Sequence, residues 1–156
     1  MKKRQYYRAI RRELKYLILC STRTDEGVEN LAEVNAAVRP SGYPDCGHHL
    51  VIRKDGTVEA CRTLDEPARC SRAHNVEAIS VAYIGGMMDG TPFFTATRAQ
   101  LDAMKAVVTT LKNCFPMVEV HTRQELAGSD PGSASLKDLV VVDPASKLQE
   151  LMDEDQ

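Results

Sequence analysis

Residues 47–59 read GHHLVIRKDGTVE, and residues 84–86, IGG, close a second apolar run further along the chain. In the first stretch, two runs of β-forming residues flank Lys54-Asp55-Gly56. Asp and Gly accept the positive φ angles of tight turns, so the stretch predicts a β-hairpin. Because side chains alternate along a strand, we expect His48 to share a face with Leu50 and Ile52, and His49 to lie opposite as a buried, hydrogen-bonded histidine. Only one of the two histidines would then line a given cleft.

Outward from the hairpin, the sequence alternates between strand and helix patterns. Apolar runs predict strands at 16–21, 78–84 and 117–121, and helical periodicity predicts helices at 3–13, 28–38 and 97–115. Thr97 and Gln100 fit a capping box at the start of the longest helix, and Pro116 ends it. Residues 129–135 read as a loop, and a short acidic helix follows Pro144. This order predicts an α/β fold in which a central mixed β-sheet is flanked by helices.

Length and charge restrict the class of protein. A chain of 156 residues suits one domain. We expect a basic helical extension at 1–15, a domain at 16–142 and an acidic tail or helix at 143–156. The net charge of −2 predicts neither a nucleic-acid nor a membrane partner, although residues 2–12 are locally basic and offer a surface for a protein partner.

Cysteine use and hydropathy bear on the compartment. The five cysteines are odd in number and lack CxxC spacing, which favours a reduced compartment and buried thiols over a structural zinc knot. The apolar runs are all shorter than the roughly 18 residues needed to cross a bilayer, and the start does not resemble an export signal. These features predict a reducing compartment such as the cytoplasm.

Several separated segments together resemble one family. They are LILCST at 17–22, CGHHLVI at 46–52 with DGTVE at 55–59, HN at 74–75 with AISV at 78–81 and IGG at 84–86, and TRAQ at 97–100. In order and spacing they resemble the type 2 N-acetylmuramoyl-L-alanine amidases, a group that includes phage lysozymes and the peptidoglycan recognition proteins. The resemblance implies the fold of that family and peptidoglycan or a muropeptide as ligand. Since the start does not resemble an export signal, we expect either a cytoplasmic protein or a phage or mobile-element protein that acts at the cell wall after release.

The resemblance also implies a chemistry. Members of the family hold a zinc ion with two histidines and a Cys or Asp, and the fourth position stays open for water and substrate. The zinc polarises the lactyl amide carbonyl and activates the water that cleaves the bond between muramic acid and L-alanine.

The implied zinc ligands are incomplete in this chain. The first ligand position, directly before Cys20-Ser21, is Leu19, which cannot bind a metal. His121 is the candidate for the second ligand, and a one-residue shift would place Thr122 there instead. Asp130, which precedes Pro131, matches the third ligand.

The implied catalytic and substrate-binding positions also depart from the family. His48 stands where a catalytic Tyr is common, and imidazole can serve as acid, base or ligand. Gly128 stands where an assisting Lys is expected, and Cys70 where a substrate-contacting His is expected. Cys70, His74 and Asn75 are therefore the candidate substrate-binding residues.

Three hypotheses follow. In the first, the frame of an amidase persists with a weakened or inactive site that binds muropeptide. In the second, His48, His121 and Asp130 form a rearranged zinc site near Cys70, and the protein is an active amidase. In the third, the fold is a phage or mobile-element scaffold whose partner is another protein.

Overall fold

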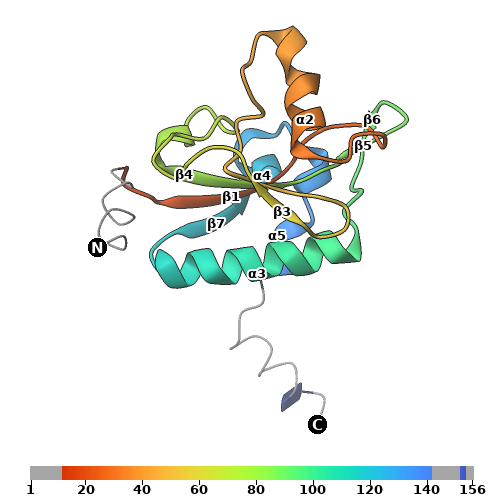
Figure 1. Cartoon of the computed structure of the whole chain (residues 1–156). Helices are drawn as coiled ribbons and strands as arrows, with labels where there is room; N and C mark the ends of the chain where they lie inside the picture. The colour runs from red at the N-terminus through yellow and green to blue at the C-terminus, as the bar shows by residue number, and fades with distance from the viewer. Residues whose placement is uncertain (1–11, 142–151, 154–156) are drawn as a thin grey trace.

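The computed structural model describes residues 12–141 and 152–153 of the chain. Its centre is a five-stranded sheet with the strand order β3-β2-β4-β1-β7 (Figure 1). The strands are β1 (Tyr16–Ser21), β2 (Leu50–Ile52), β3 (Val58–Ala60), β4 (Ala78–Tyr83) and β7 (Glu119–Thr122). β2, β4, β1 and β7 are parallel neighbours, whereas β3 pairs antiparallel with β2 at one edge. The sheet is therefore mixed, and the predicted α/β fold is confirmed.

Helices cover both sides of this sheet. Figure 1 shows the long helix α3 along one side of the sheet and α2 on the other. The α-helices are α2 (Leu31–Val38), α3 (Arg98–Cys114), α4 (Arg123–Ala127) and α5 (Leu136–Val140). The 3-10 helices are η1 (Arg39–Ser41), η2 (Asn75–Glu77) and η3 (Pro131–Ser133), and a small hairpin joins β5 (Met87–Met88) to β6 (Thr91–Pro92). Within the described residues, no helix is long and apolar enough to cross a membrane.

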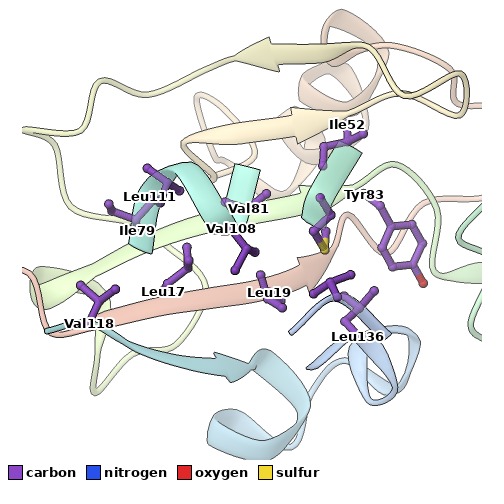
Figure 2. Close-up of a cluster of buried hydrophobic side chains, with 12 residues drawn as sticks. Leu17, Leu19, Ile52, Ile79, Val81, Tyr83, Val108, Leu111, Val118 and Leu136 are labelled. Atoms are coloured by element: carbon purple, nitrogen blue, oxygen red, sulfur yellow. The ribbon is translucent and has the colours of Figure 1, made fainter. Parts of the chain in front are cut away.

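The main hydrophobic core lies between the sheet and α3. Leu17 and Leu19 of β1 and Val81 of β4 are fully buried there, and Val108 and Leu111 of α3 pack in the same cluster (Figure 2). Apolar burial of this kind contributes about 25 cal/mol per Å² removed from water, and it fixes α3 against this face. The opposite face of the sheet is left for other contacts.

The opposite face carries smaller apolar clusters and polar side chains. Ile18, Cys20 and Ala82 form one cluster with Cys70, and Val34, Cys46, Val51 and Ile84 form another. Ser80 of β4 is also fully buried on this face, between Ile79 and Val81, which point toward α3. Polar groups buried here need hydrogen-bond partners, and the site described below supplies them.

Most predicted elements form, with shifts at their ends. β1, the hairpin of β2 and β3, β4, and α3 with its complete capping box are confirmed. The helix predicted from residue 28 begins at Leu31, because Asn30 is its N-cap and accepts a hydrogen bond from Glu33 N. The strand predicted at 117–121 starts at Glu119, because Pro116 and Met117 form a turn after α3.

Three further expectations concern one loop and the two ends of the chain. Within 129–135, residues 131–133 form a 3-10 turn rather than an irregular loop. Residues 12 and 13 are not helical, and the rest of the helix predicted at 3–13 lies outside the described residues. Of the tail beyond Pro144, only residues 152–153 are described, and they are helical.

The expected alternation fails at His48. Leu50 and Ile52 pack in the core under α3, whereas His48 hydrogen-bonds Ser80 on the opposite face of the sheet. The reason is that regular pairing of β2 begins only at Leu50, and Gly47 has a φ of 81°, so the extended alternation does not reach back to residue 48. The expectation for His49 is confirmed. It is fully buried, Nδ1 accepts from Ser80 N at 3.0 Å, and Nε2 lies 2.7 Å from the Glu66 carbonyl.

Candidate functional site

A cavity of about 460 Å³ opens on the face of the sheet opposite α3. His48, Cys70 and Asn75, three of the predicted site residues, line it. Four arginines also line it, namely Arg23, Arg69, Arg72 and Arg123. We call this cavity the arginine pocket. A larger cavity of about 820 Å³, lined mainly by apolar residues such as Leu111 and Phe115, lies at the end of α3 and holds none of the predicted site residues.

His48 lies at the base of the arginine pocket, where 2% of it is exposed. Its Nε2 is 3.2 Å from Arg123 Nη2, and its Nδ1 is 2.6 Å from Ser80 Oγ. A guanidinium can only donate, so Nε2 accepts and Nδ1 carries the proton that is donated to Ser80. Burial, more than any other cause, lowers the pKa of His48. The imidazole is therefore neutral, and its single lone pair is engaged by Arg123.

Cys70 lies beside Cys20 on the wall of the same pocket. A hydrogen bond from the Cys20 thiol is the main cause that lowers the pKa of Cys70 to about 7, whereas burial raises the pKa of Cys20. Cys20 Sγ is also 3.4 Å from Ser80 Oγ. A continuous series of side-chain contacts thus runs from Arg123 through His48 and Ser80 to the thiols of Cys20 and Cys70.

His74 and Asn75 shape the loop that carries Cys70. Asn75 Oδ1 accepts from the backbone N–H groups of Cys70 and Ser71 at 2.8 and 2.9 Å, and Asn75 also lines the pocket. The His74 ring is 2.8 Å from Ser71 Oγ and packs edge-on against Tyr16, so its contacts are with the loop and β1. Asn75 therefore lines the pocket and holds the loop, while the contacts of His74 are with the loop and β1.

His121 and Asp130 lie in different surroundings. His121 Nδ1 is 3.0 Å from Glu125 Oε1, its Nε2 is 3.5 Å from Glu119, and its side chain is 24% exposed. Asp130 is fully buried and accepts hydrogen bonds from Ser21 N at 2.7 Å and Ser21 Oγ at 2.6 Å. The two side chains share no partner among these contacts.

The residues at the implied metal positions do not fit a zinc ion. Leu19 is fully buried in the core beside Leu136 and offers no donor atom (Figure 2). Thr122, the register partner of Leu19, uses its hydroxyl to cap α4 by accepting from Glu125 N. Across residues 12–141 and 152–153, no three His, Cys, Asp or Glu side chains gather closely enough to hold a metal. We therefore derive no chemical step through zinc.

Arg123 is the central residue that the sequence analysis missed. It is the first residue of α4, and the capping box of Thr122 and Glu125 turns the chain there, directly after β7. Its side chain is 3% exposed and reaches between His48 and Asp130, with Nη1 3.9 Å from Asp130 Oδ2. Arg23 follows the neighbouring parallel strand β1 in the same way. The ends of adjacent parallel strands meet at one edge of a sheet, and this is the signal that would have brought the two arginines together.

Comparisons with known proteins bear on the fold and the family of the chain. No family model matches the chain. The endolysin of Escherichia phage T7 is 31% identical over 121 residues, which cover 76% of this chain and 79% of that protein. The solved N-acetylmuramoyl-L-alanine amidase LysC from Clostridium intestinale has a TM-score of 0.67 at 18% identity, covering 88% of this chain and 87% of LysC. Drosophila peptidoglycan recognition protein SD has a TM-score of 0.63 at 15% identity, covering 82% of each chain.

The fold is thus the one shared by N-acetylmuramoyl-L-alanine amidases and peptidoglycan recognition proteins. The chain belongs to the phage endolysin family within this amidase group.

Proposed function

We propose that this protein is a phage-encoded member of the amidase family that binds muropeptides at the cell wall, with weakened or absent amidase activity. The observation that carries the proposal is the buried guanidinium of Arg123, which reaches between His48 and Asp130 in the pocket. A permanent positive charge at this place disfavours the binding of a zinc ion beside it, because two like charges in a water-poor site repel each other strongly.

The state of His48 supports a binding role over hydrolysis. A general base needs a free lone pair within reach of the proton that it takes. The only lone pair of neutral His48 accepts from Arg123, and the other nitrogen donates to Ser80. With Leu19 in the core, neither the activated water nor the base of an amidase has an evident source among the described residues.

Structural relatives support the choice of ligand. The peptidoglycan recognition proteins LC and LE have been solved with tracheal cytotoxin, a monomeric diaminopimelic-acid-type peptidoglycan. The fold similarity, with TM-scores of 0.66 and 0.65, places the present chain in the same architecture. The phage endolysins to which it is similar support a phage origin and action at the cell wall.

The proposal is tested with purified sacculi, by measuring retention of the protein and release of soluble muropeptide with and without added zinc. We expect retention and little or no release under both conditions. Arg98 serves as the control position, because it lies on the exposed side of α3 and, among the described residues, pairs only with Asp102. The variant Arg98→Gln should be retained like the unmodified protein.

Two outcomes would redirect the assignment. Zinc-dependent release that is lost in Asp130→Asn would favour the rearranged active site of His48, His121 and Asp130. Failure to be retained on sacculi would favour the scaffold hypothesis, in which residues 1–12 contact a protein partner. All of those residues except Arg12 lie outside the described part of the chain.

A further inference from the structure

The arginine pocket concentrates positive charge in a chain whose net charge is −2. Its arginines come from the loop after β1, the loop that carries Cys70, and the start of α4. None of the described residues that line the pocket is an Asp or a Glu. A concave site lined by charge of one sign focuses the field and attracts ligands of the opposite sign.

The donors of Arg123 are only partly used by the protein. Among the described residues, His48 Nε2 lies 3.2 Å from its Nη2, and the Cys20 thiol is a second polar neighbour. The contact of Arg123 with Asp130 is longer, at 3.9 Å, and its Nε is buried without a hydrogen-bond partner. A guanidinium carries five N–H donors, so the Nη groups of Arg123 keep donors that an acceptor in the pocket can use.

The neighbouring carboxylates offset only part of the positive charge of the pocket. Burial, followed by the charge of Arg123, lowers the pKa of Arg23, which shows that the two cations crowd each other. Asp130 accepts hydrogen bonds from the neutral backbone and hydroxyl of Ser21 and lies 3.9 Å from Arg123. Asp45 pairs with Arg62 at 3.0 Å and with Arg69 at 3.9 Å, so two carboxylates stand beside the four arginines of the pocket. Arg72 is exposed at the rim and makes no ion pair within the described residues.

We propose that the arginine pocket binds its ligand through a carboxylate, and that it prefers a carboxylate to a neutral ester or amide of the same shape. The proposal rests on the function proposed above and names the group recognised at that site. The planar fork of a guanidinium matches the two oxygens of a carboxylate, which gives charge-assisted hydrogen bonds that a neutral carbonyl makes less well. The pocket would thus favour the acid end of a cleaved muropeptide over the intact amide.

The test compares N-acetylmuramic acid with its methyl ester by titration calorimetry on the full chain. We expect the acid to bind at least about tenfold more tightly than the ester, since one charge-assisted pair accounts for such a factor. Binding of the acid should weaken as salt rises, because salt screens partly exposed charges. Equal affinities for acid and ester, or no dependence on salt, would overturn the proposal.

Variants locate the effect. Arg123→Gln should lose about tenfold in affinity for the acid and little for the ester, while Arg98→Gln should match the unmodified protein. If Arg123→Gln fails to fold, Arg72→Gln and Arg23→Gln provide the same comparison at the rim, each with a smaller loss. If Arg123→Gln folds, and if it, Arg23→Gln and Arg72→Gln all bind the acid as tightly as the unmodified protein does, the assignment of the site is overturned.

Two further outcomes separate this inference from the proposed function. Retention on sacculi with equal binding of acid and ester would leave the proposed function standing and sink the carboxylate preference. Preference for the acid without retention on sacculi would support the carboxylate preference and contradict the proposed function. Inorganic phosphate is the third probe. If it binds as tightly as N-acetylmuramic acid does, the pocket is a general anion site, and the proposal that it recognises a muropeptide carboxylate is overturned.

Discussion

Arg12 ties the start of the described chain to the loop that carries the site. Its Nε and Nη2 donate to the carbonyl of Leu64 at 3.1 and 2.7 Å, and its Nη1 donates to the carbonyls of Val76 and Ala78 at 2.9 and 3.0 Å. Residues 64 to 78 include Cys70 and Asn75, so one guanidinium holds both ends of this loop. We predict that Arg12→Ala destabilises the fold and loosens the loop.

The magnitude follows from these four bonds. A hydrogen bond contributes about 1 kcal/mol net, and the carbonyl of Val76 is exposed enough for water to replace the donor, so about three bonds count. The free energy of unfolding should fall by about 3 kcal/mol, and the melting temperature of a domain of this size by about 6 to 12 °C. Arg12→Lys keeps the charge without the fork, and we expect it to recover about a third of the loss.

Urea denaturation of the three proteins, with Arg98→Ala as a surface control, measures the prediction. Arg98 pairs with Asp102 on the exposed side of α3, and such pairs contribute about 0.5 kcal/mol or less. Hydrogen exchange should rise between residues 64 and 78 in Arg12→Ala before it rises in β1. If the free energy of unfolding of Arg12→Ala lies within about 0.5 kcal/mol of that of the unmodified protein, the hydrogen bonds of Arg12 to these carbonyls do not hold the loop, and the prediction is refuted.

Three further predictions concern single positions. Alkylation of Cys70 by iodoacetamide, followed by mass spectrometry, should accelerate as pH rises through about 7, because the pKa of its thiol is about 7 and the thiolate is the nucleophile. Thr97→Ala removes the cap of α3 and should lower the free energy of unfolding by about 1 kcal/mol in urea. Gly86→Ala should cost about 2 kcal/mol or more in the same assay, because φ is 97° and the added Cβ would lie 2.1 Å from Ser21 Oγ.

Each of these has its own control. Cys70→Ser should remove the alkylation that changes near neutral pH, and a midpoint above pH 8 would contradict the role of Cys20 as donor. Thr97→Ser keeps the hydroxyl and should be nearly neutral. Gly90 has a φ of 75° and open space around it, so Gly90→Ala separates backbone strain from the clash at Gly86. Equal losses at Gly86 and Gly90 would show that the contact with Ser21 contributes nothing.

Local signals in the sequence account for most of the fold. Asp55-Gly56 between β-forming runs produced the hairpin, and Thr97 with Gln100 produced the capping box of α3. Both depend on residues within a few positions of one another, so the sequence carries them directly. The alternation at His48 failed, because a strand pattern does not reveal where regular pairing begins.

The candidate site was predicted in part. His48, Cys70 and Asn75 do line one pocket, whereas His121 lies among glutamates, and the role of each residue toward a ligand stays a prediction. The sequence showed that Leu19 lacks a metal-binding atom, but not that it belongs to the core under α3. Arg123 carried no local pattern that set it apart from the other arginines of the chain.

The opening stretch, GHHLVIRKDGTVE, determined by itself the hairpin and, with the segments around it, the family frame. Only the tertiary structure decided which side chains meet in the pocket on this fold. Parallel pairing of β1 with β7 brings Arg23 and Arg123 to one edge, and the loop held by Arg12 adds Arg69 and Arg72. Electrostatic fields and hydrogen-bond directions depend on distances in space between residues 100 or more positions apart in the chain, such as Arg23 and Arg123 or Ser21 and Asp130, and no local pattern encodes them.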